Sequence, residues 1–199
     1  MKLIERGEVL GLAEYEKIRD PFRARVIAEK KSRRVSLGPN ASCVFENRDT
    51  ALMQIQEMLR TERITREAAI LHEIETYNQL VPADHELSAT VLIEIDEKLQ
   101  RDNFLVEAKG LDRSFALIVG GARCKGKHDE ARESLDRTTA VHYLKFPLEP
   151  AAESALREVL AKTKKPADVV IELVVEHPRY AARTTLPDAL VASLAEDLV

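Results

Sequence analysis

The sequence predicts an α+β fold: a mixed, largely antiparallel sheet packed by helices, with an N-terminal helical hairpin. Two observations predict it. Apolar residues recur at helical spacing in the first 80 residues, and β-rich runs follow, of which ADVVIELVVEH at 167–177 is the strongest. The 199 residues are 45% hydrophobic and 32% charged, which is typical of a globular chain. We expect residues 1–199 to form a single α+β domain.

A helix and a β-hairpin are expected first. Residues 12–31 carry apolar residues at helical spacing, and Pro21 is expected to interrupt or start this helix. Residues 34–46 alternate between polar and apolar around Gly38-Pro39-Asn40, which indicates a turn between two strands.

Two helices should follow and form an antiparallel hairpin. Asn47 or Asp49 can cap the first helix, and Thr65 can cap the second, at 66–80. The first helix has a narrow apolar stripe with polar residues at its margin. Gln56, Glu62 and Arg63 fall within or beside that stripe, so we expect their side chains near a buried seam, where polar atoms need partners. The stripes consist of Leu52, Ile55 and Leu59, and of Ile70, Ile74, Tyr77 and Val81.

The rest of the chain alternates between strands and helices. The stretch 96–112 has weak periodicity, and 122–137 is expected to be a polar loop with some helix. The order strand, helix, strand over 139–176 allows a parallel pair with a crossover helix that starts at Pro150. The final helix should bury Leu190, Val191, Leu194 and Leu198. Strands are expected at 87–95, 114–121, 139–146 and 167–177.

Composition excludes several classes of protein. No apolar run reaches the roughly 18 residues of a membrane span, and the first residues lack the apolar core of a signal peptide. Cys43 and Cys124 cannot form a disulfide framework, so a cytoplasmic location is expected. The net charge is −4, yet residues 17–34 contain eight basic and two acidic side chains. We expect this basic face to pair with the acidic remainder. Nucleic-acid binding is not favoured, because no aromatic stacking platform accompanies the basic face.

Short motifs give little support for catalysis or metal binding. His72 and Glu75 lie on the outward face of their helix and have no matching pair, so no metal site and no cofactor are expected. Cys124 beside Lys125 and His128 is either a reactive thiol of lowered pKa or, as we favour, an ordinary exposed loop cysteine. GGARCKGK lacks the pattern of a phosphate loop. His142 shares its strand face with apolar residues, which favours a core histidine.

One group of polar residues could bind a ligand. Arg48, Gln56, Glu57 and Arg60 crowd the first hairpin helix, and Arg34 flanks the preceding strands. Together they could form a pocket for an anionic small molecule. The alternative, which we favour, is a network in which acids and bases pair with one another, because the two kinds occur in near-equal number.

Several phrases of the sequence resemble one bacterial family, called domain of unknown function 3501. They are FRARVIAEKKSRRVSLGP, FENRDTALMQIQEMLRTERI, YNQLVPADHELSATVLIEI, AVHYLKFPL and EHPRY, and they run in order from about residue 22 to 180. The resemblance implies a link to rubrerythrin-like and iron–sulfur oxidoreductase systems of bacteria. The chain itself has no cysteine set for a cluster.

Two functions are therefore expected as alternatives. The first is a non-enzymatic accessory protein with a protein partner in such an oxidoreductase system, favoured by the lack of a recognisable catalytic constellation. The second is an enzyme or sensor that binds an anionic small molecule through the five polar residues named above.

Overall fold

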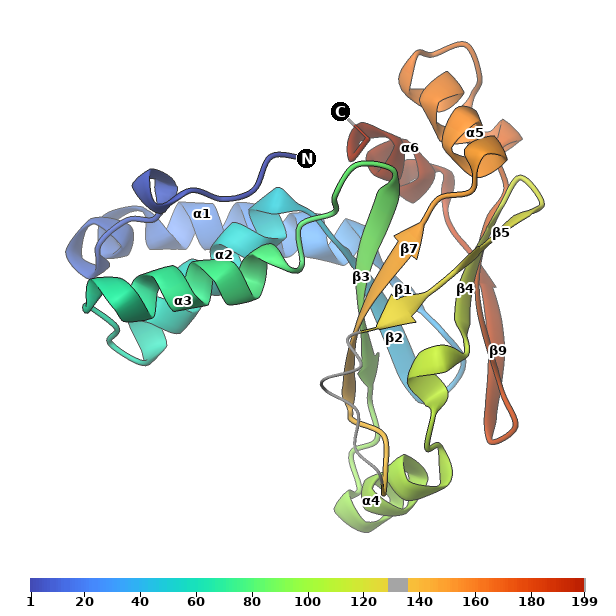
Figure 1. Ribbon diagram of the computed structural model, residues 1–199, viewed down its shortest axis with the longest axis horizontal. Coiled ribbons are helices and arrows are strands. Elements are labelled where there is room, and N and C mark those ends of the chain that lie inside the picture. The colour runs from blue at the N-terminus through green and yellow to red at the C-terminus, as the bar shows by residue number, and fades with distance from the viewer. Residues whose placement is uncertain (129–135, 199) are drawn as a thin grey trace.

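Helices and two antiparallel sheets make up the chain, as a computed structural model shows for residues 1–128 and 136–198 (Figure 1). The α+β class is confirmed. The α-helices are α1 (Leu12–Ser32), α2 (Arg48–Thr61), α3 (Glu67–Asn78), α4 (Lys98–Glu107), α5 (Pro150–Leu160) and α6 (Asp188–Glu196); η1 (Arg6–Glu8), η2 (Leu111–Arg113) and η4 (Pro166–Asp168) are single 3₁₀ turns. The strands are β1 (Arg34–Ser36), β2 (Ala41–Glu46), β3 (Glu86–Ile93), β4 (Phe115–Val119), β5 (Ala122–Lys125), β6 (Lys127–His128), β7 (Val141–Pro147), β8 (Ile171–His177) and β9 (Tyr180–Thr185).

The strands divide between two sheets. One has the order β1-β2-β3-β7-β6 and the other β5-β4-β8-β9, and neighbouring strands within the described residues run antiparallel. The predicted parallel pair over 139–176 was wrong, because β7 and β8 belong to different sheets and α5 connects them. A strand–helix–strand order in sequence is the same for a crossover within one sheet and for a connection between two.

The two sheets share one apolar core. Phe45, Val91 and Leu144 enter it from the first sheet, and Leu117 and Leu173 from the second. Side chains two apart on a strand lie on the same face, so the opposite face of the first sheet carries Ser42, Glu46, Ser88 and Thr90 instead. The last helix closes this core with Leu190, Val191 and Leu194, and Leu198 joins them just after the helix ends, so all four predicted side chains are buried.

Three helices project from one side of the sheets, as the left half of Figure 1 shows. We call residues 1–32 and 48–81 the arm, and residues 34–46 and 86–198 the two-sheet region. The arm has a separate and smaller apolar cluster, formed by Ile4, Val9, Ala51, Ile55, Leu59, Ile70, Ile74, Leu80 and Val81.

Helix α1 runs through Pro21 without interruption, so the break predicted there was wrong. Proline within a helix loses one backbone hydrogen bond and costs about 3 kcal/mol. Contacts on both sides of Pro21 offset this cost, because Tyr15 is buried before it and Val26 after it. They are the only buried side chains of this 21-residue helix.

The helical hairpin confirms one predicted cap and corrects others. Asn47 caps α2: its side chain accepts a hydrogen bond from the Thr50 amide at 3.0 Å. Gln56 is buried as expected. Glu62 and Arg63, by contrast, are exposed, because α2 ends at Thr61 and the chain turns away. The second helix is capped at Arg66 rather than at Thr65.

The structure adds elements that sequence periodicity did not reveal. Helix α4 buries Leu105 as its one fully buried side chain and exposes Leu99 and Val106, so its apolar residues form no stripe. Strands β5 and β6 lie in the stretch that was expected to be a loop. Sequence periodicity did not reveal them because they are short and highly charged. The part of that stretch at 129–135 lies outside the described residues.

Candidate functional site

Gln56 holds the N-terminal segment against α2. Its side-chain oxygen accepts a hydrogen bond from the Leu10 amide at 2.7 Å, and its side-chain nitrogen donates to the Leu10 carbonyl at 3.2 Å. The side chain is 2% exposed, so both of its polar ends are satisfied inside the protein. It is therefore occupied by the chain itself.

Glu57 and Arg60 tie α2 to α1. The Glu57 carboxylate accepts hydrogen bonds from the Tyr15 hydroxyl at 2.8 Å and from the Arg19 guanidinium at 2.8 and 2.9 Å. The bond from Arg19 lowers the pKa of Glu57, so this carboxylate is ionised at neutral pH. Arg60 forms a two-pronged ion pair with Glu16 at 2.8 and 3.2 Å. Both residues have internal partners.

Arg48 and Arg34 complete the predicted group but lie apart from each other. Arg48, at the start of α2, pairs with Glu8 and donates to the Lys2 carbonyl at 3.0 Å. Arg34, on β1, donates to the Ser42 hydroxyl at 2.7 Å and pairs with Glu94. Four of the five residues thus lie on α2 and Arg34 lies on β1, and each has an internal partner, which favours the network interpretation over a shared pocket.

The basic stretch at 17–34 is largely paired as well. Arg19 and Arg23 approach Glu57, at 2.8 and 3.7 Å. Further ion pairs join Arg25 to Asp49, Lys30 to Glu46, Arg33 to Asp197, and Arg34 to Glu94. This is the arrangement expected from pairing of the basic face with the acidic remainder.

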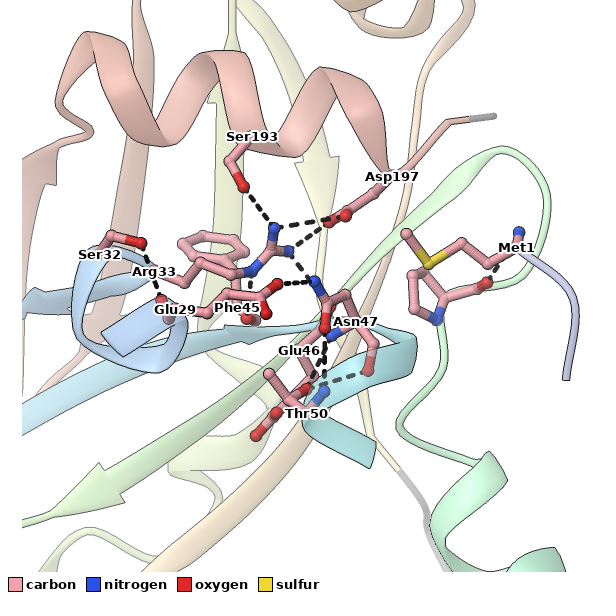
Figure 2. A network of polar contacts seen from close by, with 11 residues as sticks. Met1, Glu29, Ser32, Arg33, Phe45, Glu46, Asn47, Thr50, Ser193 and Asp197 are labelled. Carbon is pink, nitrogen blue, oxygen red and sulfur yellow. Dashed lines mark hydrogen bonds and ion pairs between the residues drawn. The ribbon is translucent and has the colours of Figure 1, made fainter. Parts of the chain in front are cut away.

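A buried polar network lies where α1, β2 and α6 meet (Figure 2). Arg33, 1% exposed, forms an ion pair with Asp197 near the C-terminal end of α6. Its guanidinium also donates to the Phe45 carbonyl at 2.8 Å and to the Ser193 hydroxyl at 2.7 Å. Burial raises the pKa of Asp197 to about 6, against the opposing effect of Arg33.

Glu46 is the second buried carboxylate of this region. It accepts a hydrogen bond from the Thr90 hydroxyl at 2.7 Å, and the Lys30 ammonium lies 3.7 Å from the same oxygen. Its other oxygen, Oε2, is buried without a hydrogen-bond partner among the described residues. Sequence reasoning missed Arg33 and Asp197 as a pair, because 164 positions separate them and no local pattern links them.

A pocket opens beside β6. Arg113, Lys125, Gly126, Lys127 and His128 line it, and its volume is about 560 Å³. Gly126 passes so close to the core that an added Cβ would lie 3.0 Å from the Phe115 carbonyl oxygen and 3.1 Å from the Phe146 ring. A larger residue would push this backbone away, so glycine is required at the point where the chain passes from β5 to β6.

Asp112 and His142 lie close to His128, which lines this pocket. The His128 ring lies 3.5 Å from the Asp112 carboxylate. His142, on β7, is 4% exposed and packs against the Phe115 ring, which confirms the expected core histidine. Burial lowers the pKa of His142 from 6.5 to about 4, so its ring is neutral at pH 7. Its Nε2 atom has no hydrogen-bond partner among the described residues.

The cysteine predictions were wrong. Cys124 lies buried on β5, and burial raises the pKa of its thiol, so it is neither a reactive thiol nor an exposed loop residue. Cys43 is buried on β2, where burial likewise raises its pKa. The first two glycines of GGARCKGK form the turn of the β4–β5 hairpin, with φ of 55° at Gly120 and 89° at Gly121. A strand follows them, unlike the helix that follows a phosphate loop.

Within residues 1–128 and 136–198, no group of three or more metal-ligating side chains converges. The same residues contain no helix with both the length and the apolarity for a membrane crossing.

Comparison with known proteins gives the family. A model of the family described as protein of unknown function (DUF3501) matches residues 3–198. The chain belongs to the DUF3501 family. No curated protein matches the sequence of this DUF3501 member significantly. A crystal structure of a novel protein of unknown function from Burkholderia pseudomallei K96243 is similar at 34% sequence identity, with a TM-score of 0.88 and complete coverage of both chains. The arm and both sheets are therefore features of a fold that at least two proteins share.

Proposed function

We propose that this protein is a non-enzymatic accessory protein of the cytoplasm, and that its arm binds a protein partner. One observation supports this most: the residues best suited to hold a small ligand on the arm are occupied by internal contacts. Gln56 forms two hydrogen bonds with the Leu10 backbone, and Glu57 accepts hydrogen bonds from Tyr15 and Arg19. Two buried free cysteines fit a reducing compartment.

The arm also leaves most of its longest helix exposed. Helix α1 buries two of its 21 side chains. Ile18 is 43% exposed and Ile27 42%, and Leu71 on α3 is 47% exposed. Charged side chains lie between them in the sequence, so a partner that binds here would contact a surface of mixed polarity, as non-obligate interfaces do. The family resemblance points to the partner's class, a rubrerythrin-like or iron–sulfur oxidoreductase.

Site-specific photocrosslinking tests this function. A photoreactive phenylalanine analogue at Ile18 should crosslink to a purified oxidoreductase of either class. The same analogue at Val170, which is 56% exposed and lies outside the arm, is the matched control. Crosslinks at Ile18 alone are the expected result. An absence of crosslinks at Ile18 with both classes of oxidoreductase, or equal crosslinking at Val170, would contradict the proposal.

Binding of an anionic small molecule through Arg34, Arg48, Gln56, Glu57 and Arg60 receives less support, because internal partners hold all five.

A further inference from the structure

Strand β9 forms one edge of the second sheet. The order of this sheet is β5-β4-β8-β9, so among the described residues β9 pairs with β8 alone, and Figure 1 shows it at the outside of the molecule. We propose that β9 pairs antiparallel with β9 of a second copy of this chain, which joins the second sheets of both copies into one. The edge belongs to the two-sheet region, so this inference is independent of the function proposed for the arm.

The backbone of β9 offers hydrogen-bonding groups at this edge. Just after β9, the Leu186 amide donates a hydrogen bond to the Ile171 carbonyl on β8 at 2.8 Å. Successive residues of an antiparallel strand direct their backbone groups to opposite sides, so those of Ala181, Arg183 and Thr185 point away from β8. These three residues are exposed, and no hydrogen bond joins their amides or carbonyls to another described residue. A second strand could therefore bond to them without displacing an existing contact.

The other sheet edges are shorter and more densely charged than β9. Strands β1, β5 and β6 have three, four and two residues, and each carries a lysine or an arginine. Strand β9 has six residues, YAARTT, with Arg183 as its one charged side chain and no proline. Short length, charge and proline are the usual devices that prevent a sheet edge from pairing with another chain. Strand β9 therefore has the features of an edge that pairs.

The charge of Arg183 selects one register for this pairing. Residues whose backbone groups point outward oppose one another across the two-fold axis of such a pair. If Arg183 opposed its own copy, like charges would meet, which is destabilising. A shift in one direction would place Ala181 opposite Pro187, which has no amide hydrogen to donate. A shift in the other direction places Ala181 opposite Arg183 of the second copy, and it places Ala182 opposite its own copy at the axis. This last register has small side chains at its centre.

An acidic residue of β8 complements Arg183 in this register. Within one chain, Ala181 lies opposite Glu176 on β8. Arg183 of the second copy would lie on the other side of Ala181 and on the same face, with its Cα about 10 Å from that of Glu176. The arginine side chain can cross the small alanine to approach that carboxylate. In the single chain, Glu176 pairs with Arg123 at 2.6 Å, and Arg183 lies 3.4 Å from Glu172. Pairing of the two copies therefore brings opposite charges together and opposes no like charges.

Disulfide crosslinking of the full chain tests the pairing and its register. Ala182 and its copy would form a pair without backbone hydrogen bonds, with Cα atoms about 4.5 Å apart, which is within the range of a disulfide. We expect Ala182→Cys to form a covalent dimer under mild oxidation, seen by non-reducing gel electrophoresis and reversed by a reducing agent. The native residues Cys43 and Cys124 are buried. The unmodified chain should therefore give no covalent dimer.

Thr184→Cys is the matched control for the register. Thr184 lies on the same face of β9 as Ala182 and is also partly buried. The proposed register places Thr184 opposite Tyr180 of the second copy, so it is separated from its own copy by about 13 Å along the strand. Thr184→Cys should therefore give no covalent dimer.

Sedimentation equilibrium measures the affinity of the pairing. In Ala181→Lys, a lysine would oppose Arg183 of the second copy, and this repulsion occurs twice across the two-fold axis. The dissociation constant of the dimer should therefore rise at least about tenfold. Ala24→Lys adds the same charge at an exposed position on α1 and should leave the constant unchanged. Circular dichroism should show that both variants remain folded.

Three results would overturn the proposal. The first is a monomeric unmodified chain at about 100 µM, which would mean that β9 pairs with another protein or with none. The second is a covalent dimer of Thr184→Cys in an amount equal to that of Ala182→Cys, which would contradict the register. The third is a dimer of Ala181→Lys as tight as that of the unmodified chain, which would place the contact between copies away from β9.

Discussion

The arm and the two-sheet region achieve their stability in different ways. The two-sheet region buries a large apolar cluster between its sheets and beneath α5 and α6, whereas the arm has nine buried apolar residues in its cluster. The arm compensates for its smaller apolar cluster with hydrogen bonds and ion pairs. Among them are the hydrogen bonds of Gln56 to the Leu10 backbone and those of Glu57 with Tyr15 and Arg19. Packing therefore determines the two-sheet region, and hydrogen-bond geometry determines how α1 lies on α2.

One buried ion pair links the two regions, and its removal should have the largest effect. Arg33→Met leaves the Asp197 carboxylate buried without its partner, which should lower the free energy of unfolding by about 3–5 kcal/mol. Urea unfolding followed by circular dichroism measures this. The double variant Arg33→Met/Asp197→Leu is the control and should recover most of the loss, because no unpaired charge remains. A loss below about 1 kcal/mol in the single variant would show that water reaches Asp197.

Within the two-sheet region, His142 should make stability depend on pH. Burial lowers its pKa from 6.5 to about 4, so the folded protein binds fewer protons than the unfolded chain between these values. The contribution to stability is complete above pH 6.5 and is lost as the pH falls towards 4, by up to about 3 kcal/mol.

His142→Leu removes this term, so the variant should lose less stability than the unmodified protein between pH 6.5 and 4. The difference between the two proteins is the quantity to measure, by urea unfolding across that range. This difference separates the effect of His142 on stability from that of Asp197. The pKa of Asp197 is raised, so its effect is opposite: it stabilises the folded state as the pH falls from about 6. Parallel pH profiles for the two proteins would mean that His142 is hydrated in the folded state.

In the arm, loss of the hydrogen bonds between Gln56 and Leu10 should have a smaller and local effect on stability. Gln56→Ala leaves the Leu10 amide and carbonyl without their partner, which should cost about 1–3 kcal/mol. Amide hydrogen exchange should accelerate in α1 and leave β4 and β8 unchanged. Gln54→Ala is the matched control, because Gln54 lies on the same helix and is only partly buried. Faster exchange throughout both sheets would mean that the arm and the two-sheet region unfold together.

The smallest effect is expected at the surface pair of Arg60 and Glu16. Both side chains are largely solvated, at 38% and 55% exposure, so salt and side-chain entropy offset most of their attraction. Arg60→Ala should shift the thermal midpoint by little more than the error of measurement, and raised salt should abolish the shift. A large, salt-independent loss would place this pair among the contacts that determine the position of α1.

Sequence patterns predicted the arm's helices and the last helix well, because their apolar spacing is regular. They also predicted that the basic stretch of α1 pairs with acidic residues. They could not place Arg33 against Asp197, or Lys127 beside Arg113, because these neighbours are created by tertiary structure alone. Cys124 was misjudged for a related reason: charged neighbours in sequence suggested a loop, but the strand alternation of β5 turns the thiol inward and the lysine outward.

Helix α1 enters β1 without a linker, since Ser32 ends the helix and Arg34 starts the strand. Its 21 residues span about 30 Å, so a small change in the helix direction at Arg33 displaces its far end by a larger distance. Tilting its far end would pull directly on the β1–β2 turn, where the Tyr180 hydroxyl accepts a hydrogen bond from the Asn40 amide at 3.2 Å. A protein that binds the far end of the arm would thereby act on β9, the outer strand of the second sheet, through these contacts.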